Sequence, residues 1–418
     1  MRMNVDYLID HATLATMAGG DGPSRGRDQG RLGLIQDGAL AVADGRIAAV
    51  GERADVVARV SAVDGIDLGG RLLMPGYVDA HTHLVWAGDR AAEFEQRIAG
   101  ASYLEIMAAG GGIASTVRAT RAASDAELLA GTLARQDELL DHGATTVEAK
   151  TGYGLSTEEE LRHLRILAEA DRRHPVRVVP TFLGAHAVPE EYRGRQEAYV
   201  ELVVEDMLPR VAEAWPGVFC DVFCDDRAFT ADQTALILGR AHALGLRLKV
   251  HADEFANLGC AGRAAELGAV SADHLVATPP AEMDAMAAAG TVAVLLPGTT
   301  LGLGSAHFAP AREMVGRGVA VALGTDLNPG TCPCTNLTLM LALAARYLRL
   351  TPAEALVAAT RNAAYATGVG QGAGRLEAGR AADLVAMDTD DYRALAYAFG
   401  GNPVAGVMVG GSWVRPVR

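Results

Sequence analysis

Two histidines separated by one residue stand at the end of an apolar run in the stretch PGYVDAHTHLVWAGDR, residues 75–90. On a β-strand, side chains two positions apart point to the same side, so the rings of His81 and His83 would share one face. Imidazole nitrogens are common metal ligands, and a catalytic metal site needs further ligands from elsewhere in the chain. The pair could equally be two surface histidines, so the remaining sequence has to decide between these interpretations.

Eight strand-like runs alternate with amphipathic helical stretches through the middle of the chain. The runs cover residues 72–83, 144–154, 176–187, 218–225, 246–254, 269–275, 291–298 and 319–330. The helical stretches at 124–143, 156–174, 230–245 and 351–368 each begin with a Ser or Thr, which is the residue type that caps helix N-termini. This alternation predicts an α/β fold, a (β/α)8 barrel.

Both ends of the chain carry short apolar runs broken by DG turns or glycine pairs, which is typical of small β-sheets. We therefore expect residues 1–70 and 371–418 to pair into one composite β-sandwich domain. Residues 71–370 are expected to form the catalytic barrel.

Polar side chains stand at the carboxyl ends of most of the eight runs, where the active sites of such barrels lie. These residues are His81, His83, Lys150, Tyr153, His186, His251, Glu254, His274 and Asp326. Three imidazoles and one carboxylate suit a divalent metal that keeps an open position for water, with zinc and iron as the candidates. The expected metal ligands are His81, His83, His251 and Asp326.

The motifs DAHTH, HADE, SADH and GTD, in that order, resemble the amidohydrolase superfamily. Within it, the stretches AGDRAAEFEQRIAGASY, TGYGL and DLNPG are similar to the imidazolonepropionase family. The resemblance implies a TIM-like barrel of the amidohydrolase type with one zinc or iron ion per subunit, held by the same four ligands. It implies a hydrolase that opens the ring of 4-imidazolone-5-propanoate to give N-formimino-L-glutamate in histidine degradation. It also implies a homodimer.

The resemblance places the substrate contacts on eight residues: Arg90, Tyr153, His186, Glu254, His274, Asn328, Gly330 and Thr331. The Arg90 guanidinium can hold the propionate carboxylate of such a substrate through two parallel hydrogen bonds. Glu254, His274 and Asp326 are the expected catalytic residues, because each can move a proton or polarise the reacting carbonyl. The sequence leaves open which of the three acts as the general base.

Three further features take other interpretations. In two-metal relatives a lysine bridges the metals, but we expect Lys150 to be a polar packing residue or to lie beside the substrate. The glycines at 110–112 lack the Lys-Ser/Thr of a phosphate-binding loop and are read as a mobile loop near the barrel mouth. Cys332 and Cys334 stand where small hydroxyl residues are expected in relatives, and we expect both to be buried small residues.

Composition limits the function classes. The formal net charge of −14 argues against a general nucleic-acid surface, and no apolar run is long enough to span a membrane. Five cysteines, an odd number in a long chain, argue against a disulfide framework and favour a reducing compartment. We therefore expect a cytoplasmic enzyme that acts on a small molecule.

Two other functions compete with ring opening. A deaminase acting on a heterocycle such as cytosine or guanine would share the histidines and the final Asp, and it would release ammonia. Arg90, Tyr153 and the DLNPG stretch favour ring opening over deamination. An inactive scaffold would require the loss of a metal ligand, and none of the four is missing.

Overall fold

The computed structural model describes residues 2–101, 105, 110–226 and 228–418. Part of the family-specific stretch around residues 102–109 lies outside the described residues. All expected site residues lie within them.

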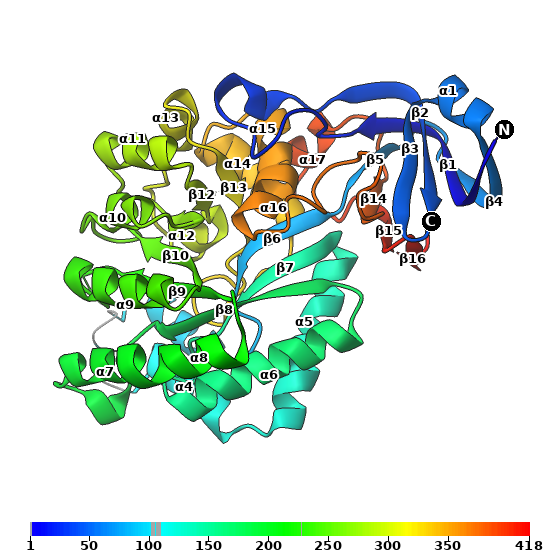
Figure 1. Cartoon of the computed structure of the whole chain (residues 1–418). Helices are drawn as coiled ribbons and strands as arrows, with labels where there is room; N and C mark the ends of the chain where they lie inside the picture. The colour runs from blue at the N-terminus through cyan, green and yellow to red at the C-terminus, as the bar shows by residue number, and fades with distance from the viewer. Residues whose placement is uncertain (1, 102–104, 106–109, 227) are drawn as a thin grey trace.

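Eight parallel strands form the barrel that the sequence predicted (Figure 1). They pair in chain order, β6 Tyr77–Thr82, β7 Ala144–Lys150, β8 Arg177–Ala185, β9 Phe219–Cys224, β10 Arg247–Ala252, β11 Ser271–His274, β12 Val292–Leu295 and β13 Val321–Leu323. The barrel closes where the first strand meets the segment after the last. There the amide of His83 donates to the carbonyl of Leu327 over 2.8 Å, and the amide of Asp326 donates to the carbonyl of His81 over 2.9 Å. The two ends of the barrel sequence are thereby joined at residues that we expect to bind the metal.

Helices follow the strands around the outside of the barrel (Figure 1). The four stretches with Ser or Thr caps are confirmed as helices: the side chains of Ser124, Ser156, Thr230 and Thr351 each accept a hydrogen bond from the amide three residues on. The last of them is interrupted by a π-helical turn, Ala358–Asn362, between α15 and α16. The helices of this part of the chain are α2 Ala91–Ile98, α4 Ile113–Ala122, α5 Asp125–Asp141, α6 Thr157–Arg173, α7 Gln196–Leu202, α8 Leu208–Ala214, α9 Ala231–Ala243, α10 Cys260–Glu266, α11 Pro280–Ala289, α12 Pro297–Gly302, α13 Ala311–Gly316, α14 Leu337–Tyr347, α15 Pro352–Val357 and α16 Ala363–Ala366, with a 3-10 turn at Glu190–Tyr192 and a π-helical turn at Val203–Met207.

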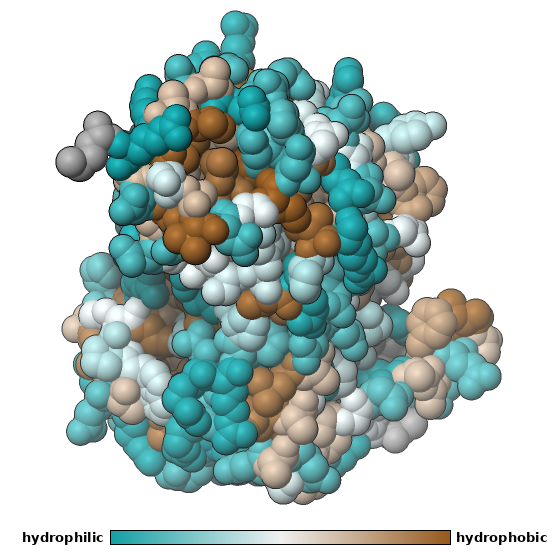
Figure 2. All heavy atoms as spheres, turned by 90° about the vertical axis from the view of Figure 1, so that its right-hand side faces the viewer, coloured by the Kyte–Doolittle hydropathy of each residue, from teal (hydrophilic) through white to brown (hydrophobic). Residues whose placement is uncertain are grey.

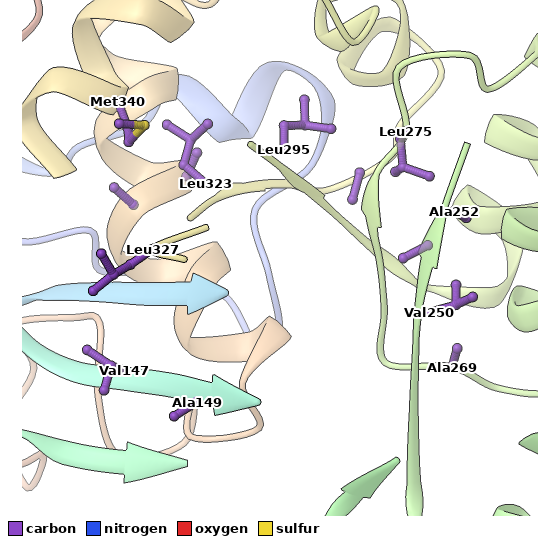
Figure 3. Close-up of a cluster of buried hydrophobic side chains, with 14 of the residues drawn as sticks. Val147, Ala149, Val250, Ala252, Ala269, Leu275, Leu295, Leu323, Leu327 and Met340 are labelled. Carbon is purple, nitrogen blue, oxygen red and sulfur yellow. The ribbon is translucent and has the colours of Figure 1, made fainter. Parts of the chain in front are cut away.

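Side chains alternate between the two faces of each barrel strand, as the pleat requires. Val147 and Ala149 of β7, and Val250 and Ala252 of β10, belong to the apolar cluster that packs the strands against the helices (Figure 3). The intervening residues of the same strands therefore point into the barrel interior. Those residues are Glu148, Lys150, Lys249 and His251, all of them buried.

Strands from both ends of the chain join in one further sheet of eight, which lies to one side of the barrel (Figure 1). Apolar side chains are buried on both of its faces, and the short helix α1 Arg53–Arg59 covers one of them. The sheet consists of β1 Met3–Ala15, β2 Leu34–Ala43, β3 Arg46–Glu52, β4 Val60–Asp67, β5 Leu72–Pro75, β14 Leu384–Met387, β15 Val404–Val409 and β16 Ser412–Arg415, accompanied by a 3-10 turn at Gly26–Gly30 and by α17 Arg393–Tyr397.

One expected strand, residues 72–83, is in fact two. β5 pairs with β1 and β14 of the end sheet, whereas β6 pairs with β7 of the barrel. The apolar run is continuous because both halves are buried, so hydrophobicity alone could not show that they belong to different sheets.

The face of the molecule that carries the end sheet is mostly hydrophilic, with apolar residues gathered in separate patches (Figure 2). Among the described residues, no helix combines the length and apolar character that crossing a membrane requires.

Candidate active site

The carboxyl ends of the barrel strands surround a cavity of about 370 Å³. Ten of the expected site residues line it: His83, Arg90, Tyr153, His186, His251, Glu254, His274, Asp326, Asn328 and Thr331. His81 lies fully buried beneath the cavity floor, and Gly330 lies against Arg90 at its side. The structure therefore brings together residues that are spread over 250 positions of the sequence, as the barrel geometry predicts.

His81 and His83 meet Asp326 on the cavity floor. The Nε2 atoms of His81 and His83 lie 3.4 and 3.6 Å from the same oxygen, Oδ1 of Asp326. The other carboxylate oxygen of Asp326 accepts a hydrogen bond from the Thr299 hydroxyl over 2.5 Å, which fixes the orientation of the carboxylate. These three residues form one group whose ligand atoms all lie within 4.8 Å of one another.

His81 also belongs to a second group of the same kind, with His251 and His274. The rings of His81 and His251 are 4.5 Å apart between centroids, and those of His251 and His274 are 5.2 Å apart. The four expected metal ligands are thus divided between two overlapping groups that share His81. His274 joins the second group, although the sequence analysis predicted only a substrate-binding and catalytic role for it.

Two buried carboxylates hold the histidine rings from below. Nδ1 of His81 lies 2.7 Å from Oδ2 of Asp273, and Nδ1 of His251 lies 3.0 Å from Oδ2 of Asp221. These contacts direct the opposite ring atoms, Nε2, toward the cavity, where both are buried and have no hydrogen-bond partner among the described residues. The sequence analysis missed Asp221 and Asp273, although each stands at a strand position that points inward in FCDVFCD and SADH.

Burial keeps four histidines of the site, His81, His83, His186 and His274, neutral. It lowers the pKa of His81, His83 and His274 well below the ordinary value, with nearby positive groups adding to the effect. Burial likewise lowers the pKa of His186 to about 3. Burial raises the pKa of Asp326 to about 6, although the hydrogen bond from Thr299 opposes the shift. Neutral imidazoles offer the lone pairs that metal binding requires.

Arg90 is oriented by a residue that the sequence analysis did not single out. Its Nε donates to Oε2 of Glu93 over 2.8 Å, and Glu93 also accepts from the amide of Gly112 and the hydroxyl of Ser115. The spacing of three residues between Arg90 and Glu93 was the available signal. The glycines at 110–112, where we expect a mobile loop, directly precede α4, and the amide of Gly112 donates to Glu93.

Gly330 allows the Arg90 guanidinium to lie where it does. A Cβ at position 330 would stand 2.2 Å from Nη1 of Arg90, which is far inside contact distance. The neighbouring Asn328 organises this loop: its Oδ1 accepts from the amides of Gly330 and Thr331, each over 2.8 Å. Its Nδ2 donates to the carbonyl of Asp326 over 2.7 Å. Asn328 lines the cavity, but its amide group is engaged within its own loop.

Glu160 holds the TGYGL turn that presents Tyr153. The buried carboxylate accepts hydrogen bonds from the amides of Gly152, Gly154 and Leu155 over 3.0, 2.9 and 2.7 Å. The carbonyl of Gly152, in turn, accepts from Nδ1 of His186 over 3.0 Å. The Tyr153 ring lies 5.6 Å from that of His83, and burial raises the Tyr153 pKa, so the phenol stays protonated.

Glu254 stands at the start of the loop after β10. Its Oε2 lies 3.8 Å from Nδ1 of His274, so the two expected proton-transfer groups face each other across the cavity wall.

The cysteines differ in part from expectation. The sulfur of the buried Cys224 is bonded to that of Cys260 at the start of α10, a disulfide that the sequence analysis did not foresee. The two residues are 36 positions apart, so no local spacing indicates the pair. Cys332 is buried and Cys334 is partly buried, in agreement with the sequence analysis, and Cys220 is buried as well.

Comparisons with known proteins agree with this geometry. A sequence profile of the amidohydrolase family matches residues 72–414. An imidazolonepropionase of Herpetosiphon aurantiacus is 52% identical over 406 residues, which cover 96% of this chain and 95% of the relative. An imidazolonepropionase of Chloroflexus aggregans is 51% identical over 420 residues, which cover 98% of both chains.

Solved structures show the same fold at lower sequence identity. An adenosine deaminase from Xanthomonas campestris with bound zinc superposes with a TM-score of 0.74 at 21% identity, over 99% of this chain and 93% of that one. An atrazine chlorohydrolase from Arthrobacter aurescens complexed with zinc gives 0.70 at 20% identity, over 98% and 95%. The chain belongs to the amidohydrolase family and, at about half identity over nearly its full length, to the imidazolonepropionases within it.

Proposed function

We propose that this imidazolonepropionase-family chain hydrolyses 4-imidazolone-5-propanoate to N-formimino-L-glutamate, a step of histidine degradation. The high identity to imidazolonepropionases over the whole chain supports this substrate. The single observation that carries the proposal is the pairing of two features in one cavity. Neutral buried histidines surround Asp326 on its floor, and a guanidinium held by Glu93 stands at its side.

One divalent metal, zinc or iron, fits the floor of this cavity. We assign its ligands as His81, His83, His251 and Asp326. The Nε2 atoms of His81 and His251 support the assignment, because both are buried and accept or donate no hydrogen bond among the described residues. When bound, such an ion polarises a carbonyl oxygen and lowers the pKa of a water molecule.

Arg90 binds the propionate carboxylate of the substrate. Its Nε is already engaged by Glu93, so the two Nη groups are presented side by side in a fixed plane. A planar pair of donors matches the two oxygens of a carboxylate. The protein is acidic overall, so this local cation, rather than the general field of the molecule, holds the anionic tail.

Three groups move protons around the reacting ring. Asp326, whose carboxylate is held by the Thr299 hydroxyl, accepts a proton from the attacking water and passes it to the ring nitrogen that is released when the C–N bond breaks. Glu254 and His274 lie together on the cavity wall and face the nitrogens of the substrate ring. Glu254 acts there as an acceptor, and His274 donates its single N–H. Tyr153, His186, Asn328, Gly330 and Thr331 complete the substrate site as binding residues or as supports for its loops.

The test uses purified, metal-analysed protein and freshly generated imidazolonepropanoate. Loss of the ring's ultraviolet absorbance is followed with and without a chelator, and ammonia is assayed in parallel. Chelator-sensitive loss without ammonia, restored by zinc or iron, supports the proposal. Absence of turnover by protein that carries one metal per chain would overturn the substrate, and ammonia release from a heterocycle would establish deamination instead.

We also propose that the protein is a cytoplasmic homodimer, which the family resemblance supports. Sedimentation velocity of the full chain at micromolar concentration tests the dimer, and a single species at the monomer mass of 43.5 kDa would contradict it.

A further inference from the structure

We propose that Lys150 is a positioning residue that locks the two carboxylates orienting His81 and His251, and thereby sets the affinity of the site for its metal. This inference rests on the metal site proposed above. The sequence suggested only polar packing or a place beside the substrate for Lys150. The residue lies fully buried beneath the cavity and does not line it, which agrees with polar packing rather than with a place beside the substrate.

Three carboxylates surround the ammonium group of Lys150. Its Nζ lies 2.8 Å from Oε1 of Glu148, 2.7 Å from Oδ2 of Asp221 and 3.4 Å from Oδ2 of Asp273. All of these side chains are fully buried. Lys150 reaches them because it occupies an inward position at the end of β7, one residue beyond Ala149, which packs outward against the helices (Figure 3).

The aspartate oxygens that contact Lys150 are the same atoms that contact the histidine rings. Oδ2 of Asp221 lies 3.0 Å from Nδ1 of His251, and Oδ2 of Asp273 lies 2.7 Å from Nδ1 of His81. A rotation of either aspartate would therefore break its contact with Lys150 as well as its contact with the ring. One ammonium group thus couples the orientations of two rings that come from different strands.

The residue type at this position supports a specific role. The chain has 37 basic residues, of which only Lys150 and Lys249 are lysines. Both are fully buried in the barrel interior below the site. An ammonium group is compact and directs three donors to separate acceptors, whereas a planar guanidinium suits a single carboxylate held in its own plane. Three convergent carboxylates require the ammonium geometry in a chain that otherwise uses arginine.

Lys249 provides a matched comparison within the same network. Its Nζ lies 3.6 Å from Oε1 of Glu148 and 3.5 Å from the carbonyl oxygen of Ala80. It forms no ion pair with either of the aspartates that hold the histidines. Lys249 therefore shares the burial and charge of Lys150 without the connection to the rings.

The experiment compares two charge-balanced double variants, because loss of one lysine alone would leave an uncompensated carboxylate in the core. Glu148→Gln combined with Lys150→Met, and Glu148→Gln combined with Lys249→Met, each remove one negative and one positive buried charge. Circular dichroism and thermal unfolding establish that both apoproteins fold. Zinc affinity is then measured without substrate, by competition with a chromophoric chelator.

We expect zinc to bind the Lys150→Met double variant about 10–100-fold more weakly, the range found when groups that orient metal ligands are lost. The Lys249→Met double variant and Glu148→Gln alone should stay within about threefold of the unmodified protein. The visible spectrum of bound cobalt should change only in the variant that lacks Lys150. If the Lys150 variants fail to fold, Lys150→Arg, which keeps the charge but not the geometry, carries the same expectation for affinity and spectrum.

Equal zinc affinity in the two double variants, whether unchanged or weakened in both, would overturn the inference. Failure of the proposed function is distinguishable from this result, because the affinity measurement needs no turnover. Protein that binds zinc tightly but does not open the ring would contradict the proposed substrate but not the proposed role of Lys150. Protein that binds no divalent metal would overturn both.

Discussion

Glu160→Gln tests whether one buried carboxylate positions the turn that carries Tyr153. Three amides converge on the two oxygens of Glu160: Gly154 and Leu155 donate to Oε1, and Gly152 donates to Oε2. A glutamine has a single acceptor oxygen. When that oxygen takes the place of Oε1, the amide NH2 group faces the N–H of Gly152, and that hydrogen bond is lost.

The expected change in KM follows from the loss of this one hydrogen bond. One hydrogen bond to a charged group contributes about 1.5–3 kcal/mol. If substrate binds only to the ordered turn, this loss corresponds to a rise in KM of about 10-fold to 150-fold. The turn contributes to binding in the ground state and the transition state alike, so kcat should change by less than about threefold.

The assay is steady-state ring opening, with KM and kcat determined separately for each variant. Glu159→Gln is the matched control, because Glu159 is the preceding residue of α6 and its partly buried side chain accepts a hydrogen bond from Arg162. Hydrogen exchange should show faster exchange of the Gly152 amide in Glu160→Gln only. A folded Glu160→Gln protein with unchanged KM would refute the role that we give to Glu160.

Two further predictions concern position 330 and the interior of α6. Gly330→Ala should raise KM at least 10-fold, because the new Cβ would lie 2.2 Å from Nη1 of Arg90 and displace the guanidinium. Gly239→Ala, where a Cβ meets nothing within 4 Å, should leave KM unchanged; equal KM values in the two variants would contradict the reasoning. His163 is buried with neither ring nitrogen hydrogen-bonded among the described residues, and burial lowers its pKa to about 3. The unfolded chain binds this proton below about pH 6.5, so stability is full above that pH and falls as pH falls toward 3. From pH 7 to pH 5 the free energy of unfolding should drop by about 2 kcal/mol from this residue alone. In denaturant unfolding, the free energy of unfolding of His163→Leu should fall correspondingly less between pH 7 and pH 5. An identical pH dependence in the variant and the unmodified protein would contradict this role of His163.

Much of the site could be predicted because its parts have local signals. Most barrel strands are short apolar runs with a polar residue at or just after their carboxyl end, and each of the four expected helices has its cap in the adjacent sequence. Strand alternation placed His81 and His83 on one face without knowledge of any partner. Once a barrel was inferred, its geometry alone required the strand ends to meet, so His251 and Asp326 could be assigned to the same cavity.

The tertiary structure determined which residues contact and orient the side chains at the strand ends. Asp221 and Asp273 contact histidines that lie 30 and 192 positions away, and Cys224 pairs with Cys260 across two elements. Periodicity and capping report only on neighbours along the chain, so they carry no record of such contacts.

The division of one apolar run into β5 and β6 was hidden for the same reason, because burial in either sheet demands the same residue types. The sequence by itself thus determined which residues could do the chemistry and at which strand ends they stand. The tertiary structure determined their orientation, because orientation depends on contacts between residues that are distant in the chain.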